Sequence, residues 1–148
     1  MNKGGKKKTM SDLNGFYANW TPRLLSVMRI VVGFLFLWHG TQKLFGFPAP
    51  PPGTMPDPMP AIIWAAGALE FFGGILIMVG LLTRPVAFLL SGLMAVAYFM
   101  AHAPQGFLPL QNGGELAALY SFVFLFMAAA GGGVWSLDAL FSKKMPVL

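Results

Sequence analysis

Four long apolar stretches constrain this chain more than any other feature of its sequence. They cover about residues 23–46, 61–82, 85–102 and 115–131. Each approaches the length of about 20 residues that an α-helix needs to cross the hydrocarbon core of a bilayer. Only 10% of the 148 residues are charged, whereas about 25% is typical of soluble domains. We therefore predict an all-α integral membrane protein, folded as a four-helix bundle.

The basic residues predict the direction of the spans. The first eight residues contain four lysines, and Arg84, Lys143 and Lys144 lie in the turn after the second span and in the C-terminal tail. The links at residues 46–60 and 103–114 contain no Lys or Arg. Because cytoplasmic loops carry the excess of basic residues, we expect an inner-membrane protein with both termini in the cytoplasm.

Composition and turn signals divide the chain into three parts. These are a basic cytoplasmic segment at residues 1–22, a transmembrane domain at residues 23–141 and a basic cytoplasmic tail at residues 142–148. Pro22 follows Thr21, and a proline in the first helical turn predicts a helix start there. The basic N-terminal run is typical of an anchor on anionic lipid. It does not indicate a nucleic-acid-binding surface.

Two shorter segments complete the expected architecture. Residues 134–141 predict a short amphipathic helix on the cytoplasmic membrane surface, with Ser136 as its N-cap. Residues 46–60 contain seven of the twelve prolines. This link is either a semi-rigid lid over the outer surface or a plain linker.

The first two spans carry charges that a bilayer does not tolerate without a partner or a wet cavity. On the first span one arc of about 120° collects Arg29, Gly33, Phe36, His39, Gly40 and Lys43. Small residues let a neighbouring backbone approach closely, so this face should point into the bundle. On the second span Gly67, Glu70 and Gly74 share a face. From their expected heights we predict a buried ion pair between Arg29 and Glu70, whose simplest role is to hold two helices in register.

Polar side chains also gather at the expected outer ends of the spans. The residues that could bind a ligand there are His39, Lys43, His102, Glu115, Tyr98 and Asn112. Such a group suits the head of a quinone, because one side chain can donate to a carbonyl while another transfers a proton. The alternative is that they are ordinary interfacial residues whose polar tips reach water.

Other cofactors fit the sequence less well. Two histidines on different helices also suggest haem b, but both lie near helix ends, and a bis-histidine haem needs its macrocycle buried between helices. The same residues offer too few further ligands for zinc. The chain contains no cysteine, which excludes thiolate metal sites and disulfide exchange on its own residues. We therefore expect no metal site and no intrinsic cofactor.

Several motifs occur in a specific order along the chain. R-x3-G-x2-F-x2-HG-x2-KLFGF begins at Arg29, E-x2-GG-x5-GL-x-TR at Glu70, and NGGEL at Asn112, followed by GGG and SLD around Ser136. Over about residues 23–141 this order resembles the DoxX family of small bacterial membrane proteins. The resemblance implies a four-helix membrane bundle and an association with quinone-linked redox enzymes.

These observations lead to three functional hypotheses. We expect a quinone-interacting subunit or accessory protein of a bacterial membrane redox system, and any enzymatic activity would be that of an oxidoreductase subunit acting with a quinone. The alternative is a non-catalytic scaffold or assembly factor for a partner enzyme. The third is a small-solute or proton pathway along Glu70, Tyr98 and His102. Four helices form a thin bundle, so beyond the lipid bilayer we expect a homo-oligomer or a membrane redox partner protein.

Overall fold

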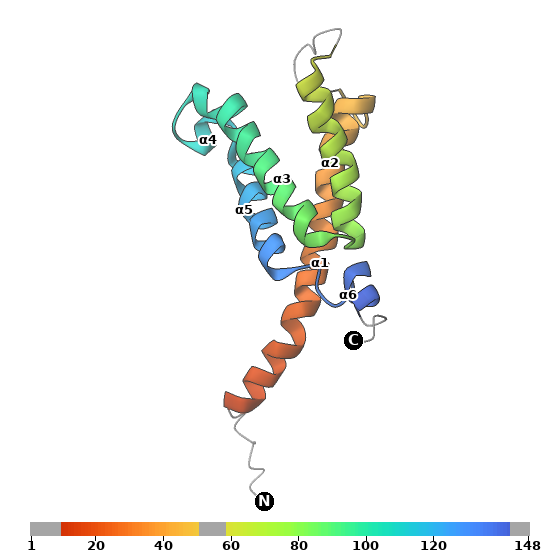
Figure 1. Ribbon diagram of the computed structural model, residues 1–148. Helices are drawn as coiled ribbons and strands as arrows, with labels where there is room; N and C mark the ends of the chain where they lie inside the picture. Colours follow the sequence, from red (N-terminus) through yellow and green to blue (C-terminus); the bar gives the residue numbers. More distant parts are fainter. Residues whose placement is uncertain (1–9, 51–58, 143–148) are drawn as a thin grey trace, which may run out of the picture.

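The computed structural model describes residues 10–50 and 59–142, and these residues form helices without any strand (Figure 1). The elements are α1 (Met10–Phe45), α2 (Ala61–Val79), α3 (Thr83–Ala97), the π-helical turn η1 (Tyr98–His102), the 3-10 turn η2 (Ala103–Gln105), α4 (Pro109–Asn112), α5 (Glu115–Ala130) and α6 (Leu137–Ser142). The predicted all-α class is therefore confirmed. The predicted lid falls mainly on residues 51–58, which lie outside the described residues.

Three helical segments are long and apolar enough to cross a membrane. They are Asp12–Phe45, Ala61–Val79 and Thr83–Gln105, the last of which joins α3 to η1 and η2. Helix α5 is also apolar but has only 16 residues, a length of about 24 Å. The structure thus supports a membrane protein with three candidate spans by length and composition, and a fourth crossing at α5 stays a prediction.

Helix α1 begins earlier than its sequence suggests. The prediction of a helix start at Pro22 is wrong, because α1 runs through this proline from Met10. A proline inside a helix removes one backbone N–H, but nearby side chains still bond to the backbone of this turn. The Arg23 guanidinium donates to the carbonyl of Asn19, and the Ser26 hydroxyl donates to the carbonyl of Pro22 at 2.9 Å.

The long helices are arranged as two close pairs, α1 with α2 and α3 with α5. We call the end that holds Met10 and α6 the terminal end, and the end that holds Phe45 and Ala61 the loop end. Helices α2 and α3 meet near the terminal end and diverge toward the loop end (Figure 1). The first turns of α1 extend past the other helices at the terminal end (Figure 1).

Glycines set the close approach of α1 and α2. A Cβ added to Gly33 would lie 2.6 Å from the backbone nitrogen of Met78, and one added to Gly40 would lie 2.4 Å from that of Phe71. Real side chains do not tolerate such distances, so the two backbones touch only because these positions have no side chain. The predicted inward-facing glycine face of the first span is confirmed.

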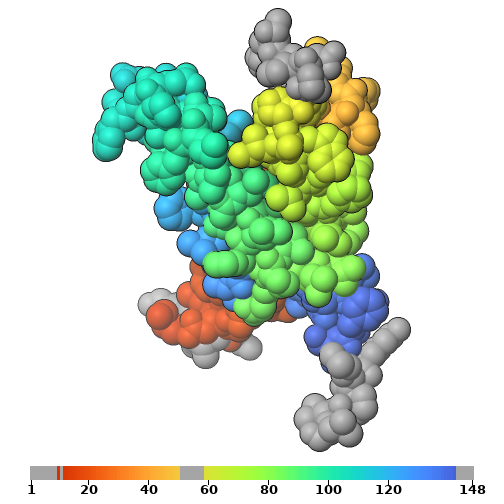
Figure 2. All heavy atoms as spheres, turned by 45° about the horizontal axis from the view of Figure 1, so that its top comes forward, coloured from red at the N-terminus to blue at the C-terminus, as the bar shows by residue number. Residues whose placement is uncertain are grey.

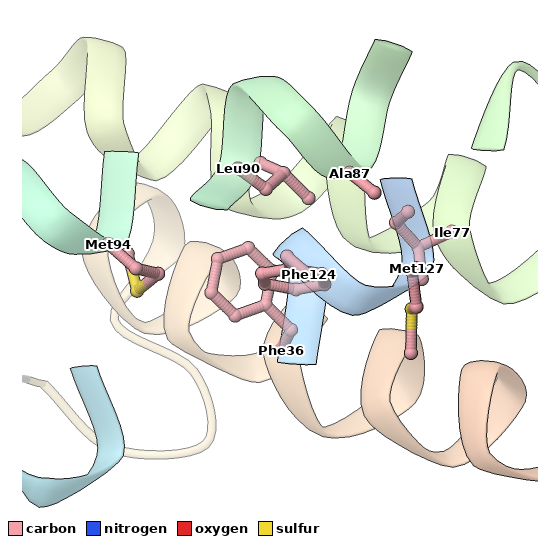
Figure 3. Close-up of a cluster of buried hydrophobic side chains, with 7 residues drawn as sticks. All are labelled: Phe36, Ile77, Ala87, Leu90, Met94, Phe124 and Met127. Carbon is pink, nitrogen blue, oxygen red and sulfur yellow. The ribbon is translucent and has the colours of Figure 1, made fainter. Parts of the chain in front are cut away.

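One apolar core fills the middle of the bundle (Figure 3). It contains Phe36, Ile77, Ala87, Leu90, Met94, Phe124 and Met127. The rings of Phe36 and Phe124 pack edge to face with their centroids 4.8 Å apart. These two side chains are 1% and 0% exposed, so their rings are buried at the centre of the core.

Helix α6 is tied to the start of α3 at the terminal end. The Asp138 carboxylate accepts hydrogen bonds from the backbone nitrogens of Leu82 and Thr83, each at 2.8 Å. The Ser136 hydroxyl oxygen accepts the N–H of Ala139 at 3.1 Å, which confirms Ser136 as the cap of the short C-terminal helix. The helix itself begins at Leu137, three residues later than predicted.

Candidate functional site

A cavity of about 220 Å³ lies among α1, α2, α3 and α5, on the loop-end side of the core. Its polar lining consists of His39, Lys43, Glu70, His102 and Tyr120. Phe36 and Met94 of the core also line it. We call this cavity the polar chamber. It concentrates donors, acceptors and charges in a part of the chain where such groups are costly.

Lys43 and Glu70 form an ion pair in the wall of the polar chamber. The Lys43 ammonium donates to both oxygens of the Glu70 carboxylate, at 2.6 and 2.5 Å. The Glu70 side chain is 3% exposed and that of Lys43 is 29% exposed. A buried carboxylate needs a hydrogen-bonded partner of opposite charge. Gly67 lets Lys43 approach, because a Cβ at Gly67 would lie only 3.0 Å from that of Lys43.

Arg29 has a different environment, at the terminal end. Its side chain is fully buried. Its guanidinium donates to four carbonyls: Ile77 and Met78 at 2.5 Å each, and Gly132 and Trp135 at 2.8 Å each. The first two carbonyls belong to the last turn of α2, where a cation also complements the helix dipole. Arg29 therefore fastens α2 to the turn between α5 and α6.

The predicted ion pair between Arg29 and Glu70 is therefore wrong. The reason is the register of two antiparallel helices. Gly33 packs against the carbonyl of Gly74, which brings Arg29 level with the end of α2, roughly ten helical residues or about 15 Å from Glu70.

His39 and Tyr120 lie next to each other in the lining of the polar chamber. Their rings meet edge to face with centroids 6.0 Å apart. In the part of the chain that the structure describes, neither the His39 imidazole nor the Tyr120 hydroxyl has a hydrogen-bond partner. Both groups are therefore available to a molecule in the chamber, Tyr120 as a donor and His39 as either donor or acceptor.

His102 enters the polar chamber from the π-helical turn η1. Such turns are rare and occur often at functional sites. The Nδ1 atom of His102 lies 3.0 Å from the carbonyl oxygen of Asn112. A carbonyl only accepts, so Nδ1 carries the proton and Nε2 of the neutral ring is an acceptor.

The other three residues predicted to bind a ligand do not line the polar chamber. Glu115 is exposed at the start of α5. Tyr98 stacks on His102 with centroids 6.4 Å apart. Asn112 is buried and holds the turn before α5, because its amide donates to the carbonyl of Gly106 and its side-chain oxygen accepts the N–H of Gly114, each at 2.8 Å. The ligand-binding roles of all six residues stay predictions.

Sequence reasoning missed two features of the polar chamber. It assigned Glu70 to Arg29 and left out Tyr120. A signal for Tyr120 was present, because only Tyr120 and Ser121 interrupt the apolar run that follows Glu115. Among the described residues, no group of three or more His, Asp or Glu side chains could hold a metal ion.

A second hollow, of about 530 Å³, lies between the loop-end halves of α2 and α3 (Figure 2). We call it the lateral groove. Lys43, Glu70, Met94 and Ala97 line both this groove and the polar chamber. Most of the remaining lining is apolar, and Ile62 and Met100 are 59% and 62% exposed. The groove therefore adjoins the polar chamber, and these four shared side chains form the boundary between the two hollows.

Comparisons with known proteins agree with the motif pattern. The sequence model of the DoxX family matches residues 24–103. A protein of Haemophilus influenzae, described as uncharacterized, is 45% identical over 131 residues, which cover 84% of this chain and 96% of the relative. The inner membrane protein YqjF of Escherichia coli is 32% identical over 128 residues, covering 80% of this chain and 92% of YqjF.

A more distant relative has similar coverage. An uncharacterized membrane protein of Mycobacterium tuberculosis is 30% identical over 144 residues, 86% of each chain. No solved structure matches this chain. The predicted family resemblance is confirmed, and the chain is a membrane protein of the DoxX family.

Proposed function

We propose that this chain is a quinone-interacting subunit or accessory protein of a bacterial inner-membrane redox system. One observation carries the proposal: a chamber with an ion pair, two histidines and a tyrosine adjoins a groove on the outer face of the bundle. Binding sites for small molecules are typically apolar hollows with a few convergent polar groups. A quinone matches this chamber because it dissolves in lipid and has carbonyl acceptors that need donors.

The polar side chains suit binding and proton exchange. The Lys43 ammonium and the Tyr120 hydroxyl are donors for the carbonyls of a quinone, and His39 can pass protons to or from its reduced form. Reduction of a quinone to a quinol takes up two electrons and two protons. The electrons would come from a partner redox enzyme in the membrane, while this chain binds the head group and exchanges protons with it.

The apolar core favours this proposal over a pathway through the bundle. A solute or proton path would need polar groups or water between the two ends. The buried pair Phe36 and Phe124 fills that position instead. A scaffold needs no polar chamber, so it predicts that loss of the chamber histidines leaves function intact.

The quinone content of the purified protein tests the proposal. We expect protein taken from membranes in mild detergent to carry extractable quinone. Combined His39→Leu and His102→Leu changes should lower that content several-fold, whereas Gln105→Leu, at an exposed residue outside the chamber, should leave it unchanged. Absence of quinone, or equal content in every variant, would contradict the proposal. A Soret band in the same sample would favour haem instead.

We further propose that the loop end faces the periplasm and that both termini are cytoplasmic, as the basic residues predict. The chain has no cysteine, so a single introduced cysteine is the only thiol to label. In cells whose inner membrane is intact and accessible, a membrane-impermeant maleimide should react with Gln111→Cys. It should react with Ser142→Cys only after lysis. The reverse pattern would overturn the orientation.

A further inference from the structure

We propose that the lateral groove holds the polyprenyl tail of a quinone whose head occupies the polar chamber, so that the ligand enters sideways from the bilayer. This inference rests on the proposed function of the chamber. It adds an access route and a requirement for a long apolar tail, neither of which follows from the chamber alone.

The chemistry of the groove suits a tail and not a head. Its apolar lining comes from α2, including Ile62, Ala66 and Leu69, and from the α3–η1 segment, including Val96 and Met100. Lys43 and Glu70 are its only polar lining residues among those described. An apolar chain in this groove would exchange contacts with lipid for contacts with side chains and would desolvate few polar groups.

The junction of the groove and the chamber positions the two parts of the ligand. Lys43 and Glu70 lie where the two hollows meet, together with Met94 and Ala97. If the head group contacts this ion pair from the chamber, the ring atom that carries the tail would lie at the inner end of the groove. Ala97 has the smallest of the four shared side chains, so the proposed connecting chain would pass beside it.

The ion pair favours a neutral head over the phosphate of a membrane lipid. The Lys43 ammonium is already neutralised by both oxygens of Glu70. A phosphate at Lys43 would bring its negative charge close to the Glu70 carboxylate, which is unfavourable in a region of low dielectric constant. A quinone carbonyl has no net charge and accepts a hydrogen bond from the ammonium without this repulsion.

The test compares two quinones that share one head. One has a polyprenyl tail and the other has none, and both are titrated into the full-length protein in lipid nanodiscs, with concentrations expressed per lipid. Val96→Trp and Ala66→Phe fill the groove without touching the chamber. Val31→Trp is the matched control, because Val31 on α1 is 48% exposed and Val96 is 52% exposed, but Val31 lies outside both hollows.

We expect both groove variants to weaken binding of the polyprenyl quinone by about tenfold, because the added ring takes the place of the tail and removes its van der Waals contacts with the groove. Binding of the tail-less quinone should not change in either groove variant, and Val31→Trp should affect neither ligand. Unchanged binding of the polyprenyl quinone in both groove variants would overturn the tail site, while binding of the tail-less quinone would still support the chamber. If wild-type protein binds neither quinone, the proposed function fails and the tail site with it.

The alternative occupant of the groove is the acyl chain of a phospholipid. The lipids and quinones that co-purify with the protein distinguish these two occupants. Native mass spectrometry should show quinone bound to the wild-type protein and less quinone bound to the groove variants. If those variants instead lose bound phospholipid and keep their quinone, the groove holds an acyl chain and the inference is wrong.

Discussion

Lys43 on α1 and Glu70 on α2 are joined by two hydrogen bonds, at 2.6 and 2.5 Å, at the point where the polar chamber meets the lateral groove. The pair links two helices and leaves the chamber wall without net charge. Because Glu70 is 3% exposed, its carboxylate is bonded to Lys43 and has little contact with solvent. Stability and ligand binding should therefore both respond to changes at these two positions.

Replacing one member of the ion pair should lower the free energy of unfolding more than its share of the loss in the double variant. Lys43→Met leaves a buried carboxylate without its partner, and Glu70→Met leaves the ammonium unpaired, so each should lower the free energy of unfolding by about 3 kcal/mol. The double variant should lose clearly less than the sum of the single losses. Unfolding in mixed micelles, analysed as a double-mutant cycle, measures this coupling, and additive losses would show that the pair does not stabilise the protein.

Arg29 should tolerate replacement by lysine poorly. An ammonium on a single nitrogen cannot reach the four carbonyls that the guanidinium holds, so Arg29→Lys should lower the free energy of unfolding by about 2 kcal/mol or more. Arg84→Lys is the control, because the exposed Arg84 bonds to only two carbonyls, those of Ala128 and Ala129. Equal, small losses for both variants would refute a structural role for Arg29.

Alanine should have opposite effects on stability at a glycine in the α1–α2 contact and at a glycine outside it. Gly40→Ala places a Cβ 2.4 Å from the backbone of Phe71 and should cost about 1–3 kcal/mol of stability. Gly92 on α3 has nothing within 4 Å of an added Cβ, so Gly92→Ala should be neutral or should stabilise the helix by up to about 1 kcal/mol. Thermal unfolding in detergent measures both, and a harmless Gly40→Ala would mean that the helices pack less closely.

Asp138 should make stability depend on pH at the terminal end. Burial raises the pKa of its carboxyl, but the hydrogen bonds from Thr83 and Leu82 and the charge of Arg29 outweigh burial and leave the pKa below its ordinary value of 3.8. A lowered folded-state pKa means that the carboxylate contributes stability above this value, and that the contribution is lost as the pH falls through the folded-state pKa.

The difference between wild type and Asp138→Asn measures this contribution. It should be about 1 kcal/mol at neutral pH, as for loss of a helix cap, and should shrink as the pH falls below the ordinary pKa. Melting temperatures across that range provide the measurement. A difference that stays constant down to strongly acid pH would show that the charge of Asp138 does not matter.

Local patterns in the sequence predicted much of the fold. The apolar runs indicated the helices, the spacing of Gly33 and Gly40 indicated the buried face of α1, and Ser136 indicated the cap of α6. These features depend on the side chain and its neighbours within a few turns, so a linear sequence contains the information. The same periodicity placed His39 and Lys43 on the inward face that reaches the polar chamber.

The partners of the charged residues could not be predicted in this way. They depend on the register between α1 and α2, which the contact of Gly33 with Gly74 sets and which no local pattern specifies. The start of α1 was also predicted wrongly, because a helix can continue through a proline when it loses only one backbone hydrogen bond. Tyr120 joins the polar chamber only because α5 packs beside α3, which is again a tertiary relationship.

Photolabelling with an azidoquinone tests the central claim most directly, because it reports where a quinone sits on the protein. After illumination and digestion, we predict that the label is found on peptides containing His39, Lys43, His102 or Tyr120, and that excess unlabelled quinone prevents the reaction. Label confined to the terminal end around Arg84 and α6, or label that unlabelled quinone does not displace, would contradict a quinone site in the polar chamber.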